Sequence, residues 1–176
     1  MKIQMVFQDP TDSLNPRSSV ADSIAEPLKR LKGMKGGRQI VAKVAELAEM
    51  VGLPRHLLSR FPHQLSGGQK ARVGIAHAIA VDPLLLMLDE PTSALDVSVQ
   101  AVVLQLLDRL KRELGMSYIF VSHDLNVVRL LCERVIVMNR GRVVESGEAD
   151  AVLNNPQDPY TQTLIAVIPH FEPARL

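Results

Sequence analysis

The chain has 176 residues and a net charge of +1, and its composition is 47% hydrophobic, 22% charged and 3% aromatic, without tryptophan. This length allows one domain with a core, while the near-neutral charge and scarce aromatic side chains argue against nucleic acid as a partner. No apolar run approaches the ~20 residues needed to cross a bilayer, and the single cysteine, Cys132, excludes an internal disulfide and is expected to be a small buried hydrophobe.

Hydrophobic periodicity predicts alternating strands and helices. Glycines at 33, 36 and 37 predict a flexible break between two early helices. Ser66 and Gln69 have the S-x-x-Q spacing of a capping box, so a helix should open there and run to about Ala80. The expected elements are, in chain order, a strand at Ile3–Phe7, helices at 19–30 and 40–51, the helix opened by Ser66, a strand at Leu84–Leu88, a long helix over 99–114, a strand at Tyr118–Val121, a hairpin of Val135–Met138 and Arg142–Glu145, and a last helix at Thr161–Val167.

The run Leu84–Leu88 decides the fold class. Five apolar residues are too few for a typical helix, and Pro83 and Pro91 bound them, which predicts a strand buried on both faces. A helix and a second strand follow. This β-α-β alternation is typical of an α/β protein whose parallel sheet is connected by helical crossovers.

Two carboxylates end this strand. Asp89 could hold Mg²⁺, usually through water, while Glu90 could polarise the attacking water in phosphoryl transfer. Adjacent residues on a strand point to opposite sides, so the strand end would separate the two tasks. An isolated Asp-Glu pair is more simply a solvated acidic loop, but the apolar run before this pair and the segment Pro91–Asp96 after it favour the catalytic interpretation.

The residues Ser66, Gly67, Gly68 and Gln69 can form an anion site. Glycines let backbone amides approach phosphate oxygens, the serine hydroxyl adds a donor, and the helix N-terminus contributes partial positive charge. The alternative is a capped helix in which the glycines only permit a turn.

Two further polar residues adjoin predicted strands. His123 follows Tyr118–Val121, and a neutral imidazole there could donate to a γ-phosphate oxygen; a structural hydrogen bond is the simpler role for a lone histidine. Gln8 could coordinate Mg²⁺ through its amide oxygen and sense nucleotide, although taken alone it is an ordinary loop residue.

In this order and spacing, the motifs resemble the ABC ATPase family across nearly the whole chain. The resemblance assigns Gln8 to the Q-loop, Leu65–Gln69 to the signature, Leu84–Glu90 to Walker B, Ser93–Asp96 to the D-loop and His123 to the switch histidine. Segments Phe7–Pro16 and Asn155–Gln162 are similar to the oligopeptide/dipeptide/nickel importer branch.

The resemblance implies an incomplete P-loop NTPase-type parallel sheet with a helical subdomain and a C-terminal β-hairpin. All 176 residues would be the C-terminal part of one nucleotide-binding domain. Its parts would be a helical and signature subdomain at about 16–80, a Walker B-to-hairpin part at 81–150 and a tail at 151–176.

ATP and Mg²⁺ are the cofactors that the resemblance implies, with ATP held between two head-to-tail domains. Ser66 and Gly68 would contact nucleotide held by the other subunit, with Gly67, Gln69 and Asp96 as further nucleotide-binding residues. Gln8, Asp89, Glu90 and His123 would act on nucleotide that is bound by the same subunit. The implied partners are a second ABC ATPase subunit, in a homodimer or heterodimer, and transmembrane permease subunits, which would place the chain peripherally at the cytoplasmic face of the membrane.

The sequence lacks G-x-x-x-x-G-K-[ST], the loop whose amides and lysine hold the β- and γ-phosphates. Set against the family that it resembles, it also lacks the aromatic residue that stacks on adenine. We therefore expect that the isolated chain does not bind ATP and that its front part was lost by truncation, a frameshift or an internal start. The leading hypothesis is the ATP-hydrolysing subunit of a peptide-type importer. The alternatives are a non-catalytic partner that completes another subunit's ATP site and a soluble non-transport ABC protein, for which a basic surface or a second set of motifs would be expected.

Overall fold

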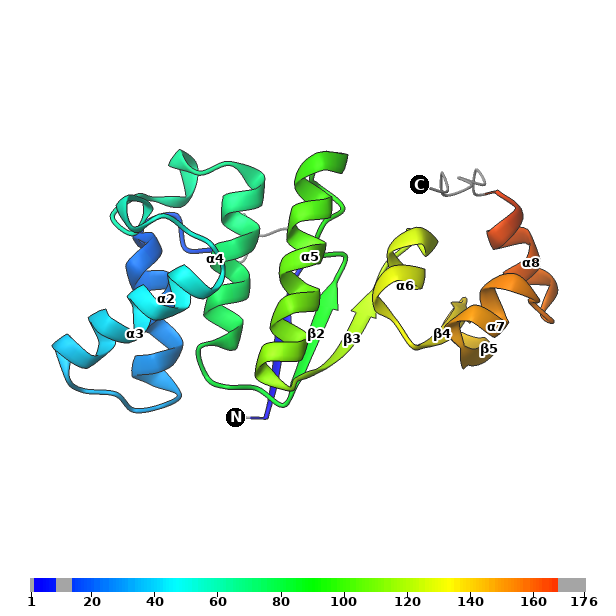
Figure 1. Ribbon diagram of the computed structural model, residues 1–176, viewed down its shortest axis with the longest axis horizontal. Helices are drawn as coiled ribbons and strands as arrows, with labels where there is room; N and C mark the ends of the chain where they lie inside the picture. The colour runs from blue at the N-terminus through cyan, green and yellow to red at the C-terminus, as the bar shows by residue number, and fades with distance from the viewer. Residues whose placement is uncertain (1, 9–13, 168–176) are drawn as a thin grey trace. The chain divides into compact units, whose positions relative to one another are not determined.

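The computed structural model describes residues 2–8 and 14–167, which form two compact units that divide between Val121 and Ser122 (Figure 1). The first unit contains β1 (Ile3–Val6), α2 (Val20–Arg30), α3 (Gly37–Met50), the 3-10 helices η1 (Arg55–Leu57) and η2 (Pro62–Gln64), α4 (Gly67–Ile79), β2 (Leu85–Asp89), α5 (Val97–Leu114) and β3 (Ser117–Val121). The second contains α6 (Leu125–Leu131), β4 (Arg134–Asn139), β5 (Arg142–Glu148), α7 (Ala149–Asn154) and α8 (Pro159–Ala166).

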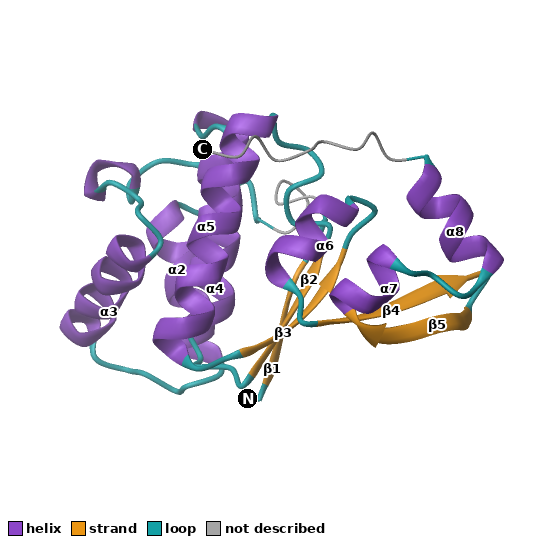
Figure 2. Cartoon of the chain, turned by 45° about the vertical axis from the view of Figure 1, so that its right-hand side comes forward, coloured by secondary structure: helices purple, strands orange, loops and turns teal. Residues whose placement is uncertain are grey.

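The first unit is built on a parallel sheet in the order β1-β2-β3. Val6, Leu88 and Phe120 lie side by side across it. The chain passes through α4 before β2 and through α5 between β2 and β3, and these helices run beside the strands (Figure 2). The predicted α/β class with helical crossovers is confirmed.

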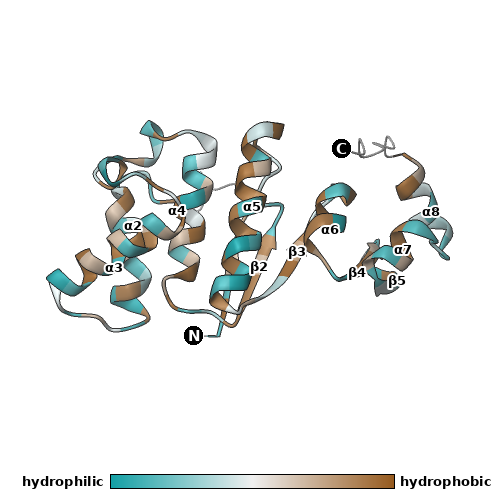
Figure 3. Ribbon diagram, viewed as in Figure 1, coloured by the Kyte–Doolittle hydropathy of each residue, from teal (hydrophilic) through white to brown (hydrophobic). Residues whose placement is uncertain are grey.

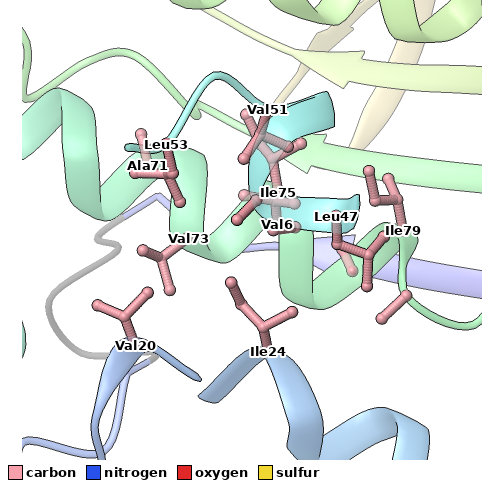
Figure 4. Packing of buried hydrophobic residues seen from close by; sticks show 14 of the residues in the cluster. Val6, Val20, Ile24, Leu47, Val51, Leu53, Ala71, Val73, Ile75 and Ile79 are labelled. Atoms are coloured by element: carbon pink, nitrogen blue, oxygen red, sulfur yellow. The ribbon is translucent and has the colours of Figure 1, made fainter. Parts of the chain in front are cut away.

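The core of this unit lies between the helices and one face of the sheet. Leu86 and Leu88 of β2 are fully buried there, and they belong to the same cluster as Ile75 of α4 and Leu107 of α5. Figure 4 shows how aliphatic side chains of the neighbouring helices and of β1 converge in this cluster. The side chains that it labels are Val6, Val20, Ile24, Leu47, Val51, Leu53, Ala71, Val73, Ile75 and Ile79.

The prediction that Leu84–Leu88 is buried on both faces is wrong. The strand begins at Leu85, Leu84 is 61% exposed, and Leu85 and Met87 are only half-buried. Because side chains alternate along a strand, helices on one face bury only every second residue.

The predicted capping box is confirmed. Ser66 precedes α4, its hydroxyl oxygen accepts a hydrogen bond from the Gln69 N–H at 3.4 Å, and the Gln69 side-chain oxygen accepts one from the Ser66 N–H at 3.0 Å. These two bonds satisfy donors that the first helical turn leaves without partners.

The break between α2 and α3 is shorter than the glycines predicted, because Gly37 is the first residue of α3. Two arginines fix the other end of α3. Arg72 of α4 donates to the Val51 carbonyl at 2.5 Å, and Arg109 of α5 donates to the Met50 carbonyl at 2.6 Å. The carbonyls at the end of a helix lack intrahelical partners, so both guanidinium groups stabilise this end and tie α3 to the other helices.

The second unit contains the predicted hairpin, in which β4 and β5 pair antiparallel around Arg140 and Gly141. Both turn residues have positive φ, 48° and 77°, as a two-residue hairpin turn with the right twist requires. Helices α6 and α7, which were not predicted, pack on this unit's own cluster of Val128, Ala149 and Leu153. Cys132 lies at the edge of this cluster and is half-buried rather than buried as expected.

None of the helices in residues 2–8 and 14–167 combines the length and the apolar character that crossing a bilayer requires.

Candidate nucleotide-binding site

Gln8, Asp89 and Glu90 lie at the carboxyl edge of the first unit's sheet. Asp89 is the last residue of β2, and Gln8 follows β1, which is parallel to β2 and paired with it. The amide nitrogen of Gln8 donates to the Glu90 carboxylate at 2.9 Å, which joins two residues that are 82 positions apart. The fold therefore brings together Gln8 and Glu90, two of the four residues expected to serve nucleotide in cis, and Asp89 directly precedes Glu90 in the chain.

The backbone at Glu90 turns sharply. Its φ is +43°, a left-handed value that is uncommon for a residue with a side chain. Three hydrogen bonds hold this conformation: the Glu90 N–H donates to the Val121 carbonyl at 2.9 Å, and the Glu90 carbonyl accepts from the N–H and the hydroxyl of Ser93, both at 3.1 Å. Asp89 thus stays on the sheet in register with Val121, while Glu90 leaves it. The two carboxylates are separated by this turn, not by strand alternation as predicted.

The donor set at this edge fits Mg²⁺. This ion prefers oxygen ligands and usually takes one or two carboxylates, with water and substrate phosphates completing its shell. Asp89 supplies a carboxylate, and the amide oxygen of Gln8 remains a possible ligand because its nitrogen faces Glu90. Across the described residues, no group of three or more His, Cys, Asp or Glu side chains could hold a metal ion.

The start of α4 presents the signature residues. Ser66 and Gly67 are exposed, whereas Gly68 is buried and Gln69 is half-buried. The first N–H groups of this 13-residue helix lie at an accessible N-terminus, where backbone donors and the helix dipole favour an anion.

The two glycines of the signature also have a packing role that the sequence did not reveal. A Cβ atom added to Gly68 would lie 2.5 Å from Cγ1 of Val99, and one added to Gly67 would lie 3.0 Å from Cδ2 of Leu95. Contacts between carbon atoms are normally no closer than about 3.5 Å. The glycines therefore let the start of α4 pack directly against Leu95 and the first turn of α5. This contact supports the alternative interpretation, in which the glycines have a structural role.

Asp96 begins α5. Its carboxylate accepts hydrogen bonds from the Val99 N–H at 3.0 Å and from the Ser98 hydroxyl at 2.7 Å. The bond from Val99, with a smaller effect of Ser98, lowers the pKa of Asp96 below its usual 3.8, so the carboxylate is ionised near neutral pH. Since Val99 also touches Gly68, the expected D-loop and the signature lie next to each other in the fold.

His123 belongs to the second unit, where it is exposed and precedes α6. Its neighbours are ordered by local bonds: the Asp124 N–H donates to the Ser122 hydroxyl, and the Asp124 carboxylate accepts from the Asn126 N–H, both at 3.0 Å. Because β3 ends at Val121, in register with Asp89, the chain leaves the sheet at its carboxyl edge two residues before His123.

A role for Glu145 in holding the tail was not predicted. Its carboxylate accepts hydrogen bonds from the N–H groups of Gln157 at 2.9 Å and Asp158 at 3.1 Å, and the bond from Gln157 is the main cause that lowers the pKa of Glu145. The segment Asn155–Gln162 is thereby tied to β5. A single glutamate in a strand carries no sequence signal for such a role. The other segment that resembles the importer branch, Phe7–Pro16, includes residues 9–13, which lie outside the described residues.

Comparison with known families agrees with these motifs. The ABC transporter family model matches residues 1–93, more than half of the chain, and the model of the oligopeptide/dipeptide transporter C-terminal region matches residues 144–176. The chain therefore belongs to the ABC transporter family, and its tail is the oligopeptide/dipeptide type of C-terminal region.

Curated relatives match almost the whole chain. The oligopeptide transport ATP-binding protein OppF of Bacillus subtilis is 48% identical over 172 residues, which are 98% of this chain and 56% of the relative. OppF of Escherichia coli is 47% identical over 97% of this chain and 51% of its own length. The glutathione import ATP-binding protein GsiA of Escherichia coli O157:H7 is 49% identical over 98% of this chain and 28% of its own length. The chain thus spans about half the length of its OppF relatives.

Solved structures support the fold. The protein cbiO1 of Clostridium perfringens, described as part of the ABC transporter complex cbiONQ, matches with a TM-score of 0.77 and 34% identity over 88% of this chain and 60% of that one. The ATP-binding cassette MJ0796, solved as a dimer bound to ADP and Pi, matches with a TM-score of 0.73 and 34% identity over 84% of this chain and 63% of that one. The P-loop NTPase-type fold expected from the motifs is confirmed.

Proposed function

We propose that this chain is the C-terminal part, from the Q-loop to the tail, of the ATP-hydrolysing subunit of a peptide-type ABC importer. The observation that carries the proposal is the hydrogen bond between Gln8 and Glu90 at the sheet edge where Asp89 ends β2. It joins a polar side chain that could sense nucleotide to the carboxylate that could activate water, beside a carboxylate suited to Mg²⁺.

ATP with Mg²⁺, when bound, supplies the γ-phosphoryl group and neutralises charge on its oxygens. Asp89 would hold the metal through water, and the Glu90 carboxylate would orient the attacking water and take up its proton. Gln8 would keep its hydrogen bond to Glu90 when no metal is bound. It would give up this bond when its amide oxygen coordinates Mg²⁺. His123 would donate a hydrogen bond to the γ-phosphate.

The signature residues would act on nucleotide held by a second ATPase subunit. Ser66, Gly67, Gly68 and Gln69 offer an exposed helix N-terminus, and ionised Asp96 lies next to it through Val99. This arrangement needs a dimer, which agrees with the dimeric ADP-bound cassette among the structural matches.

The names of the relatives support peptides as the cargo class, since they are oligopeptide transport and glutathione import proteins. The subunit would be peripheral, at the cytoplasmic face of the membrane, and would bind permease subunits. We propose that the segment from Gln8 through α3 meets the permease, because it connects directly to the Mg²⁺ edge. Residues 9–13 of that segment lie outside the described residues.

The absence of G-x-x-x-x-G-K-[ST] leads us to propose that the isolated chain binds no ATP. Calorimetric titration of the chain with Mg-ATP should give no heat of binding, and micromolar affinity would contradict the proposal.

Activity is tested in a restored domain, made by joining the chain to the part of the Bacillus subtilis OppF that precedes its matched region. This fusion should hydrolyse ATP. Glu90→Gln should abolish turnover but keep ATP binding, because the amide has nearly the same shape and accepts protons poorly. A Glu90→Gln fusion that hydrolyses at the rate of the unaltered fusion would remove Glu90 from the catalytic role.

A non-catalytic partner remains the second candidate, because the chain has a complete signature without a phosphate-binding loop. Mixing the unfused chain with an intact ATPase subunit distinguishes the two. If only this second role is correct, Ser66→Arg in the chain removes any stimulation of the intact subunit's ATPase, while Glu90→Gln has no effect.

A further inference from the structure

Charge is distributed unevenly between the parts of this chain. Residues 16–80, the expected helical and signature subdomain, contain 11 of the 20 Lys and Arg residues but only 4 of the 19 Asp and Glu residues. The net charge of this part is therefore +7, whereas that of the whole chain is +1, so the remaining residues are net negative. Such an asymmetry predicts an anionic partner for the basic part.

The cations are densest in residues 29–38, which run from the last turn of α2 to the first turn of α3 (Figure 1). This run is the basic segment. It contains no Asp or Glu, and teal in Figure 3 marks its hydrophilic residues between α2 and α3. Its five cations, all of them exposed residues, are Lys29, Arg30, Lys32, Lys35 and Arg38.

Backbone hydrogen bonds order the basic segment. The Lys32 N–H donates to the Pro27 carbonyl at 3.2 Å, and the Met34 N–H donates to the Leu28 carbonyl at 3.1 Å. Gly33 lies between these donors with a φ of +65°, which glycine adopts without strain. Met34 also packs against the main hydrophobic cluster. The cations therefore project from an ordered turn, so that binding through them would cost little ordering of the chain.

Folding explains part of this charge. Lys29 and Arg30 lie in the last turn of α2, where cations interact favourably with the helix dipole. Arg30 also pairs with Glu26 at 3.2 Å, and Lys32 pairs with Asp82 of the turn before β2.

Three of the five cations have no carboxylate partner. In the described part of the chain, no ion pair involves Lys29, Lys35 or Arg38. Arg38 lies in the first turn of α3, where the helix dipole disfavours a cation. Because like charges repel one another, an anion bound at the segment would offset a cost that the fold alone leaves in place.

The chemistry of the segment favours an anionic lipid surface. It contains no aromatic side chain on which a base could stack, and the cytoplasmic loops of a permease carry an excess of Lys and Arg, which would repel it. The cytoplasmic leaflet has a negative surface potential that attracts clusters of about 4–8 Lys and Arg side chains. Leu31 is 52% exposed among the cations, so its apolar side chain could enter the boundary between headgroups and acyl chains.

We propose that the basic segment binds anionic phospholipid headgroups of the cytoplasmic leaflet beside the permease. The inference rests on the proposed function, which places the subunit at that face of the membrane. Helix α2 has 11 residues and is therefore about 16 Å long. The end of α2 that is nearer to Gln8 in the chain can meet the permease while the end that carries the basic segment meets lipid.

The test measures co-sedimentation of the 176-residue chain with vesicles. Vesicles of phosphatidylcholine with phosphatidylglycerol should bind the chain at least about tenfold more tightly than vesicles of phosphatidylcholine alone. Raising the salt concentration from about 0.1 M to about 1 M shortens the Debye length from about 10 Å to about 3 Å and should release the chain from the anionic vesicles.

The decisive variant combines Lys29→Gln, Lys35→Gln and Arg38→Gln, which breaks no ion pair. Each cation near an anionic surface contributes about fivefold to the affinity, so this triple variant should bind the anionic vesicles on the order of a hundredfold more weakly. Its unfolding midpoint in urea should match that of the original chain. The combination Lys29→Arg, Lys35→Arg and Arg38→Lys keeps the charge and should bind the vesicles as the original chain does.

The matched control removes the same charge elsewhere. It combines Lys2→Gln, Arg140→Gln and Arg142→Gln, all at exposed residues outside the basic segment, and should keep nearly the full affinity. Equal losses in the two glutamine variants, absence of binding to the anionic vesicles, or equal binding to both kinds of vesicle would overturn the proposal. So would binding to a polyglutamate peptide or to DNA that is tighter than binding to the vesicles and is lost in the decisive variant.

Membrane binding and the proposed function can fail separately. Vesicle binding that depends on Lys29, Lys35 and Arg38, together with a restored fusion that hydrolyses no ATP, would leave the membrane proposal standing and reject the proposed function. A restored fusion that hydrolyses ATP, together with a chain that does not bind anionic vesicles, would do the reverse.

Discussion

The start of α4 and the carboxyl edge of the first unit's sheet both carry residues expected to handle phosphate, but different forces hold them. At α4, the glycines pack against Leu95 and Val99 and a capping box fixes the first turn. At the sheet edge, exposed Gln8 is joined to Glu90 by one side-chain hydrogen bond. Packing makes the signature part of the fold, whereas the Gln8 side chain at the edge is exposed to solvent. Stability should therefore respond strongly to changes at α4 and weakly to changes at the edge.

The largest effect should come from Gly68→Ala. The new Cβ would lie 2.5 Å from Cγ1 of Val99, and overpacking of this kind costs about 2 kcal/mol of unfolding free energy. Urea denaturation measures it. Gly74→Ala is the control, because it lies in the same helix with no atom within 4 Å of its added Cβ; it should stabilise by about 0.5–1 kcal/mol. If both variants shift stability alike, packing does not hold the signature.

Loss of the capping hydroxyl should have a smaller effect. Ser66→Ala removes the acceptor for the Gln69 N–H, which should cost about 1 kcal/mol. The same denaturation experiment tests it, with Ser59→Ala as the control, since exposed Ser59 caps no α-helix and its removal should change stability by less than about 0.5 kcal/mol. An unchanged midpoint for Ser66→Ala would mean that solvent replaces the cap without cost.

Asp96 should give the start of α5 a modest dependence on acid. Its folded pKa lies below the usual 3.8, so its stabilising effect is present above that value and is lost as the pH falls through the folded pKa. Asp96→Asn keeps a good N-cap but does not titrate. Thermal unfolding should therefore show that the advantage of the original chain over Asp96→Asn at pH 7 shrinks as the pH falls below 3.8. A constant difference across that range would contradict the role of the ionised carboxylate.

The smallest effect on stability should come from Gln8→Ala. Gln8 is exposed, and removing its bond to Glu90 should change the unfolding free energy by less than about 0.5 kcal/mol. In the restored domain the same change should lower the ATP hydrolysis rate, and Gln8→Glu should lower it further by placing a second negative charge beside Glu90. A Gln8→Ala variant that loses stability as Gly68→Ala does would show that the edge is structural and would break the contrast between the two regions.

Local features of the fold follow from the sequence alone, because their causes lie within a few residues. Ser66 and Gln69 form the capping box that their spacing predicted. Arg140 and Gly141 turn the hairpin where a glycine permits it, and an apolar run ending at Asp89 forms a strand. The identity of the motifs, and with it the family, could be read from their order along the chain.

Only the tertiary structure decided features that join distant residues. It placed Gln8 against Glu90, required glycine at 68 because Val99 packs there, and ended α3 on Arg72 and Arg109. It also left Leu85 and Met87 of β2 only half-buried, where the sequence predicted burial on both faces. Apolar residues specify that a strand can be buried, but which face is covered depends on the elements that pack against it, and that information is not local to the strand.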